Sequence, residues 1–262
     1  MDPNKEKIFN KAFNVFLVVG MLVSVSLTTV MNFKEPGRDA FMLLLAAACS
    51  VTGVLSTVMS ANGNILTFAF GFIDVLIGTI IYYENGIMGN FALHAFYFLP
   101  MQFIGFWQWR RRGARVKSAK GEAKKVKARR LTRRQWLFLT GAMLVGITVL
   151  YFFLLFVDNT KLEAGKILEQ NKLKILLDAV VMAANIAGQV LMSLAFMEQW
   201  YMWLIVNISS VSLWIVALMS PDASSTAAVM AVKYSFYLLN VLNGIRIWLT
   251  LSNKKEQVLD NC

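Results

Sequence analysis

Residues 97–109 read YFLPMQFIGFWQW, and residues 236–248 read FYLLNVLNGIRIW. When the two stretches are aligned, a glycine falls over a glycine and, four residues later, a tryptophan falls over a tryptophan. Each stretch also begins with an aromatic pair. The agreement predicts an internal repeat. The matched positions are Gly105 with Gly244, Trp109 with Trp248, and His94 with Lys233.

Both stretches lie at the ends of long apolar blocks. Of the 262 residues, 57% are hydrophobic and 16% are charged, and the mean hydropathy is +0.57. Soluble domains carry about 25% charged residues. Blocks of about 20 apolar residues match the hydrocarbon core of a bilayer, which is about 30 Å thick. The short alternating segments of a membrane barrel are absent from the sequence. We therefore expect an all-α integral membrane protein.

Eight apolar spans can be read, separated by short turns such as Glu35-Pro36-Gly37, Asn62-Gly63, Glu84-Asn85-Gly86 and Ser220-Pro221-Asp222. The first span is longer than the apolar core of a signal peptide, so an uncleaved helix is predicted. The predicted spans are 12–33, 41–60, 64–83, 87–109, 135–157, 175–197, 199–219 and 224–251.

The net charge of +11 is concentrated in one loop. Residues 110–134 hold 13 of the 26 Lys and Arg with one acid, Glu122, so the remaining chain has a net charge of −1. A short basic loop beside an apolar span is the usual mark of the cytoplasmic side. Binding of anionic lipid head groups is an alternative role, and nucleic-acid binding is not expected.

A cytoplasmic 110–134 loop orients every span. Counting outward from it places both termini in the cytoplasm, and Lys5, Lys7, Lys254 and Lys255 then lie on that side as well. The loop 158–174, where four lysines balance Asp158, Glu163 and Glu169, becomes external.

The repeat sets the architecture. Spans 2–4 and spans 6–8 form two three-helix units, and the single linking span between them makes the units parallel. Transporters with such repeats hold their solute between the halves near the midplane. The predicted division is an extra N-terminal helix and loop (1–40), a first repeat (41–109), the basic loop (110–134), a linking helix with an external loop (135–174), a second repeat (175–251) and a cytoplasmic tail (252–262).

Span 7 carries a polar and aromatic face. Trp200, Trp203, Asn207, Ser210 and Trp214 follow a 3-4-3-4 spacing and share one side of a helix. The two inner tryptophans could anchor at the membrane boundary. An amide near mid-span is costly unless it is paired, so Asn207 either bonds a neighbouring helix or binds a ligand.

Further amide side chains occur in three other spans. Span 6 has Asn185 and Gln189 one turn apart, span 8 has Tyr237, Asn240 and Asn243, and span 4 has Tyr97 and Gln102 around Pro100, which can bend the helix. Amides beside aromatic rings suit a neutral or cationic ring that bears hydroxyl groups.

Ionisable residues inside the spans are few. They are Asp74, His94, Asp178, Lys233 and Arg246, and a group of this kind is a functional candidate by default. Whether Asp74 pairs with Lys233 stays open at this point. One histidine and two distant cysteines make a metal site or a disulfide framework improbable. The sequence has no phosphate-binding loop of the GxxxxGK[ST] type and no GxSxG motif, so no enzyme activity and no cofactor are expected.

Two motifs resemble the PnuC family of bacterial nicotinamide riboside transporters. One is the stretch from Tyr97 to Gly105 with Trp107 and Trp109, and the other runs from Glu198 to Trp203 and on to Asn207, including a WxxW pattern. The likeness covers spans 2–8. It implies a SWEET-like 3+1+3 fold, facilitated diffusion of nicotinamide riboside (vitamin B3) in the cell inner membrane, a homotrimer, and trapping of the solute by a cytoplasmic kinase.

The resemblance carries the ligand role onto eight residues, of which Asn185, Gln189, Trp203 and Asn207 are the strongest. They are Gln102, Asn185, Gln189, Trp200, Trp203, Asn207, Tyr237 and Asn240. Alternative readings are a transporter of thiamine or another related vitamin, and a substrate-binding membrane subunit of a larger transporter. A membrane-bound enzyme acting on lipid is disfavoured because the sequence lacks acidic or histidine clusters.

Overall fold

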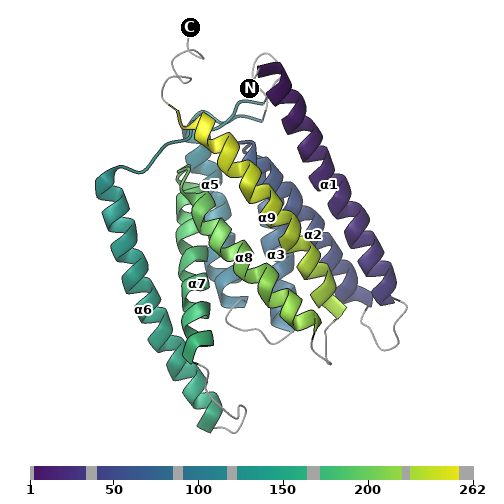
Figure 1. Cartoon of the computed structure of the whole chain (residues 1–262), viewed down its shortest axis with the longest axis vertical. Helices are drawn as coiled ribbons and strands as arrows, with labels where there is room; N and C mark the ends of the chain where they lie inside the picture. The colour runs from purple at the N-terminus through teal and green to yellow at the C-terminus, as the bar shows by residue number, and fades with distance from the viewer. Residues whose placement is uncertain are drawn as a thin grey trace.

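The computed structural model describes residues 3–33, 40–84, 91–116, 123–163, 172–219 and 225–253, and these ranges are helical apart from the short connections. The helices stand roughly side by side in one bundle (Figure 1). They are α1 (Pro3–Phe33), α2 (Ala40–Ala61), α3 (Thr67–Glu84), η1 (Leu93–Phe98), α5 (Leu99–Arg111), α6 (Arg133–Glu163), α7 (Lys172–Ser193), α8 (Gln199–Leu218) and α9 (Ser225–Leu251).

The structure confirms the all-α membrane fold with an extra first helix. Within the described ranges, α1, α2, α3, α6, α7 and α9 are each long and apolar enough to cross a membrane. The continuous rod of η1 and α5, and α8 with 20 residues, supply the other two spans. Figure 1 shows the start of α1, the end of α9 and the connection from α5 to α6 at one end of the bundle.

The two predicted repeats make equivalent contacts. A Cβ on Gly105 would lie 2.2 Å from the Phe68 ring, and one on Gly244 would lie 2.5 Å from the Trp200 ring. In each repeat, therefore, an aromatic ring from the middle helix packs directly on the glycine of the last helix. Only glycine permits this approach, which explains why the glycine occurs in both copies of the motif.

The matched tryptophans join one repeat to the other. Trp109 Nε1 donates to the Met192 carbonyl oxygen at 2.8 Å, and Trp248 Nε1 donates to the Ser60 carbonyl oxygen at 3.0 Å. Both indoles are fully buried. Met192 lies near the end of α7 and Ser60 near the end of α2, so the last helix of each repeat bonds the first helix of the other.

The basic loop is partly an ordered segment, which we call the basic strap (residues 123–130). Its Val126 N–H donates to the Gly63 carbonyl oxygen at 2.9 Å, and its Arg129 N–H donates to the Ala195 carbonyl oxygen at 3.0 Å. Gly63 belongs to the connection within the first repeat, and Ala195 to the corresponding connection within the second. The basic strap thus ties together the same end of both repeats.

Several predicted boundaries differ from the helix ends: α1 begins at Pro3 rather than at residue 12, α6 ends at Glu163 rather than at residue 157, and α7 ends before residue 197. The span placed at 175–197 ends at Ser193, and the following residues form a tight turn with Ala195 at φ 58°. The sequence has no glycine or proline there to mark the turn. The backbone of Arg129, in the basic strap, stabilises this turn through two hydrogen bonds. Its N–H donates to the Ala195 carbonyl oxygen, and its carbonyl oxygen accepts from Met197 N–H, both at 3.0 Å.

The helix before Pro100 differs from a simple proline bend. Residues 93–98 form a π-helix, and Leu99 N–H donates to the His94 carbonyl oxygen across the wide turn. A proline cannot donate to the carbonyl one turn back, and the π-helical turn accommodates this loss. π-Helical turns occur often at functional sites.

The linking helix α6 begins with a reciprocal cap. Thr132 N–H donates to Gln135 Oε1 at 2.9 Å, and Gln135 N–H donates to Thr132 Oγ1 at 3.4 Å, which fixes the start of the helix. The extra helix α1 packs on α2 and α9. Arg246 of α9 bonds Glu6, Asn10 and Asn243, so its charge is held by α1.

Some sequence predictions lie outside the described residues. They include the turns at 34–39, 85–90 and 220–224, part of the basic loop (117–122), most of the external loop (164–171), the tail with Lys254 and Lys255, and the side chain of Trp214.

Candidate functional site

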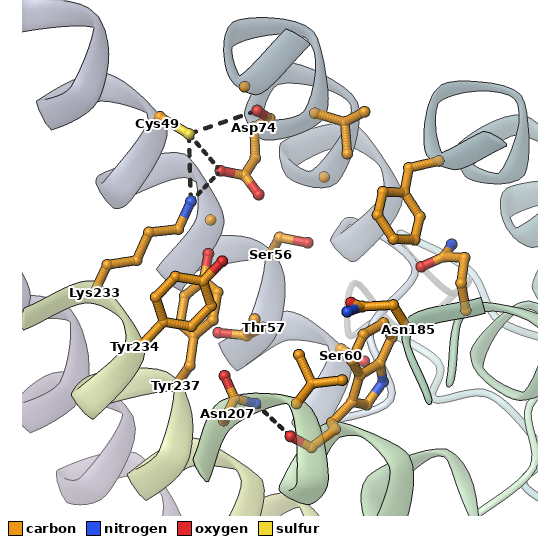
Figure 2. A pocket seen from close by; sticks show the side chains of 18 of the residues that line it. Cys49, Ser56, Thr57, Ser60, Asp74, Asn185, Asn207, Lys233, Tyr234 and Tyr237 are labelled. Atoms are coloured by element: carbon orange, nitrogen blue, oxygen red, sulfur yellow. Dashed lines mark hydrogen bonds and ion pairs between the residues drawn. The ribbon is translucent and has the colours of Figure 1, made fainter. Parts of the chain in front are cut away.

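A cavity of about 190 Å³ lies between the two repeats. A cavity of about 150 Å³ is sufficient to hold a benzene ring, so this space has room for an aromatic ring and for further groups attached to it. Helices α2, α3, η1 and α5 supply one wall, and α7, α8 and α9 supply the other. Figure 2 shows side chains from both walls converging on it.

All eight residues predicted as the ligand site line this cavity. The structure brings together Gln102 of α5, Asn185 and Gln189 of α7, Trp200, Trp203 and Asn207 of α8, and Tyr237 and Asn240 of α9. Tyr97, the neighbour considered with Gln102, is not among the lining residues. Its hydroxyl donates to the Ile186 carbonyl oxygen at 2.8 Å and joins η1 to α7.

Three of the lining amides bond to their own helix one turn back. The Asn207 amide nitrogen donates to the Trp203 carbonyl oxygen at 2.7 Å, and that of Asn185 donates to the Val181 oxygen at 3.0 Å. Gln102 does the same with Phe98 at 3.3 Å. These bonds orient the side chains, because each amide keeps its oxygen for another partner. For Asn207, the bond seen is within α8 rather than to a neighbouring helix.

Several buried polar atoms of the cavity lining lack a protein partner within the described ranges. They are Gln189 Nε2, Trp200 Nε1, Asn207 Oδ1, Tyr237 Oη, and both amide atoms of Asn240. Buried polar atoms are nearly always paired in native proteins. A concentration of unpaired donors and acceptors around one cavity is what a site for a polar ligand requires.

The walls differ at equivalent positions of the two repeats. Trp203 of the second repeat corresponds to Gly71 of the first, since each lies three residues after the ring that packs on the repeat's glycine. The Trp203 ring lies on Gly188, where an added Cβ would be 3.3 Å from it. At Gly71, by contrast, the amide of Gln102 occupies the space, 2.6 Å from such a Cβ. One wall therefore offers an indole and the other an amide.

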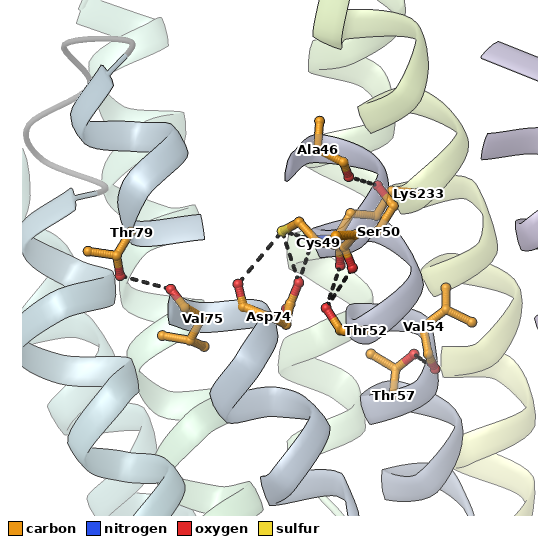
Figure 3. Close-up of polar contacts among 11 residues, drawn as sticks. Ala46, Cys49, Ser50, Thr52, Val54, Thr57, Asp74, Val75, Thr79 and Lys233 are labelled. Carbon is orange, nitrogen blue, oxygen red and sulfur yellow. Dashed lines mark hydrogen bonds and ion pairs between the residues drawn. The ribbon is translucent and has the colours of Figure 1, made fainter. Parts of the chain in front are cut away.

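A charged cluster joins the two walls of the cavity. Lys233 Nζ lies 3.0 Å from Asp74 Oδ1 and 3.3 Å from Cys49 Sγ, and the Cys49 thiol donates to Asp74 Oδ1 at 3.1 Å. Figure 3 shows this cluster between α2 and α3, beside hydroxyls such as Ser50 Oγ that bond their own helix. The ion pair, which the sequence left open, connects α3 of the first repeat with α9 of the second.

Sequence reasoning missed several lining residues. Ser56, Thr57 and Ser60 of α2 line the cavity, although hydroxyls in an apolar helix gave only a weak signal. Tyr82 and Tyr234 also line it, and Figure 2 shows Tyr234 beside Tyr237 along one wall. The alignment of His94 with Lys233 was a usable signal, because both residues reach the cavity from corresponding helices.

The part of the chain that the structure describes contains no group of three His, Cys, Asp or Glu residues that could hold a metal ion. The polar lining consists mainly of amides and hydroxyls, with one ion pair. Such a set can bind a solute reversibly through hydrogen bonds and ring stacking.

Comparison with known proteins gives one family. Residues 43–250 match the family model described as "Nicotinamide mononucleotide transporter". The nicotinamide riboside transporter PnuC of Neisseria mucosa is 34% identical over 207 residues, covering 79% of this chain and 72% of that protein. The corresponding protein of Haemophilus influenzae is 30% identical, covering 79% and 80%. A crystal structure of the vitamin B3 transporter PnuC matches with a TM-score of 0.65 at 30% identity, covering 90% of this chain and 91% of that one.

Proposed function

The chain belongs to the PnuC family of membrane transporters, and on this premise we propose that it carries nicotinamide riboside across the bacterial cytoplasmic membrane. The observation that carries the proposal is the cavity between the repeats, where unpaired amide atoms lie close to an indole. The riboside has a flat cationic pyridinium ring with a carboxamide, joined to a sugar with hydroxyl groups. Each of these parts finds a chemical counterpart in the cavity lining.

The ring of the solute suits Trp203. A cation over an indole gains about 0.5–2 kcal/mol, and the packing of Trp203 on Gly188 holds the indole in place. The hydroxyls and carboxamide both donate and accept, which suits Gln189, Asn207 and Asn240. We assign the ligand role to the eight predicted residues on this basis.

The cavity favours the riboside over the mononucleotide named in the family description. Lys233 is the only Lys or Arg among the described lining residues, and Asp74 already pairs with it at 3.0 Å. A phosphate carries a charge of about −1.5 to −2 near pH 7, and burying it without a free cation is costly. A phosphorylated solute therefore lacks a partner for its charge.

The proposed mechanism is facilitated diffusion. The sequence has no GxxxxGK[ST] phosphate-binding loop, and the charged cluster in the cavity balances its own charge. Uptake becomes one-way when a separate cytoplasmic kinase phosphorylates the riboside, because the product no longer fits the site. By family resemblance we propose a homotrimer. The basic clusters support a topology with both termini in the cytoplasm, by the positive-inside rule.

Reconstitution of the purified protein alone in liposomes tests the function. We expect uptake of labelled nicotinamide riboside without ATP, saturating with concentration and reaching equal concentrations inside and outside. Thiamine and riboflavin serve as competing vitamins in the same assay. Uptake of thiamine in preference to the riboside would assign the other vitamin. No uptake of any of them, despite riboside binding by the same preparation, would identify a binding subunit that needs a partner.

A further inference from the structure

A second hollow lies away from the cavity, between the linking helix α6 and α7. It has a volume of about 400 Å³ and is almost entirely apolar. We call it the α6–α7 groove. Among the lining residues that the structure describes, Gln135 is the one with a polar side chain. The lining is Leu131, Gln135, Phe138, Leu139, Ala142, Met143, Gly146, Leu150, Ala183, Ile186, Ala187, Val190, Leu191, Leu194 and Phe196.

The groove is open to the lipid side of the bundle. Figure 1 shows α6 at the edge of the molecule, next to α7. Phe138, which forms part of the groove wall, is 79% exposed. Along α6 the lining runs from Gln135 to Leu150, about 22 Å at 1.5 Å per residue. One leaflet of the hydrocarbon core is about 15 Å deep, so the groove is long enough for an acyl chain.

One end of the groove is strongly basic. The Arg129 guanidinium lies 3.9 Å from the ring centroid of Phe196, which is a lining residue. The Arg129 side chain is half-buried. Arg134 is exposed and lies one turn before Phe138, at the edge of the groove. Both arginines lie where α6 begins, and the positive end of the helix dipole adds to their field.

Arg129 has a charge that the protein itself does not balance. Its neighbour Arg130 pairs with Glu198 at 2.9 Å, whereas no carboxylate contacts Arg129 within the described ranges. Partial burial and the nearby Arg112 charge both lower the pKa of Arg129. An anion placed at this end of the groove would relieve both unfavourable effects.

From this arrangement we propose that the α6–α7 groove is a binding site for an anionic phospholipid. One acyl chain lies in the groove, and the phosphate contacts Arg129 and Arg134 at the level where α6 begins. A second copy of the chain fits less well. Copies in one membrane share an orientation, so a neighbour would bring its own basic loop to the same depth.

Lipid-dependent thermal stability tests the site in the full-length protein in detergent. Phosphatidylglycerol is the anionic probe and phosphatidylcholine the neutral control. We expect phosphatidylglycerol to raise the melting temperature more. Gly146→Leu should abolish this difference, because Gly146 lines the groove and its Cβ position is open, with no heavy atom within 4 Å. Gly141→Leu is the matched control on the same helix, equally unobstructed but outside the lining, and should keep the difference.

The head-group contact is tested with Arg134→Gln and Arg129→Gln. We expect the apparent affinity for phosphatidylglycerol to fall about fivefold in each. Arg129→Gln also loses a bond to the Leu194 carbonyl oxygen, so Arg134→Gln decides the question if the first variant fails to fold. Equal stabilisation by both lipids would overturn the proposal, as would identical behaviour of Gly146→Leu and Gly141→Leu. A change of oligomeric mass in Gly146→Leu would assign the groove to a second copy instead.

Discussion

Replacing Asn240 with leucine should separate ligand binding from stability. Asn240 is 1% exposed, lines the cavity and has no partner for either amide atom among the described residues. The change keeps the number and the branching of the side-chain heavy atoms but removes a donor and an acceptor. A ligand group left unpaired costs about 1–3 kcal/mol, so the affinity for nicotinamide riboside should fall about 5- to 150-fold. The unfolding temperature should stay the same or rise.

Asn243 supplies the matched control one turn further along α9. It is equally buried but does not line the cavity, and its Oδ1 accepts a bond from Arg246 at 2.8 Å. Asn243→Leu should therefore leave the affinity unchanged. The lost bond costs about 1 kcal/mol, which lowers the melting temperature of a chain of this size by about 2–4 °C.

Isothermal titration calorimetry and thermal unfolding of both variants, in the same detergent, measure the two quantities. We expect the two asparagines, although they lie on one helix, to show opposite patterns. If Asn240→Leu binds the riboside as tightly as the unaltered protein, Asn240 does not belong to the site. If both variants lose stability and affinity together, the amides of α9 have a structural role.

Four further results are expected. Asn207→Ala and Gln189→Ala should each weaken riboside binding about 5- to 150-fold while the melting temperature is retained. Trp203→Ala should weaken binding at least as much. If calorimetry shows normal binding in these stable variants, the site lies elsewhere. Nicotinamide mononucleotide should bind much more weakly than the riboside, because Lys233 is paired with Asp74; similar affinities would contradict this. Gly105→Ala and Gly244→Ala should each destabilise the fold by about 1–3 kcal/mol, since the new Cβ meets an aromatic ring, while Gly141→Ala should not; equal melting temperatures would refute the packing argument. A cysteine placed within 115–130 should be protected from an impermeant thiol reagent added outside intact cells, and one within 160–170 should react; the reverse pattern would invert the topology.

The membrane fold was predictable because its signals are local. Apolar blocks fix the spans, and the short Gly-x-x-x-Trp motif revealed the repeat that the contacts of Gly105 and Gly244 confirm. The turn at Ala195 was not predictable, because its left-handed backbone is held by Arg129, which is distant in sequence. The helix boundary predicted at residue 197 failed for this reason.

The amides of the cavity were predictable and the charged cluster was not. Asn185, Gln189 and Asn207 are conspicuous in apolar helices, and helical spacing places them on shared faces. The pairing of Asp74 with Lys233 depends on how α3 and α9 pack across the repeats, and spacing within one helix carries no information about that. The hydroxyls of Ser56 and Ser60 were missed because serine is tolerated in membrane helices without any ligand.

The reciprocal bonds of Trp109 and Trp248 are the pattern of a two-fold dimer, in which each contact occurs twice. A receptor with perfect two-fold symmetry would accept a solute equally well in either of two poses. Here the outer contacts are duplicated but the inner surface is not. Trp203 occupies the position that Gly71 has in the other half, and Lys233 occupies the position of His94. The broken symmetry makes the two ends of the cavity chemically distinct. A solute with a base at one end and a sugar at the other is thereby held in a single pose.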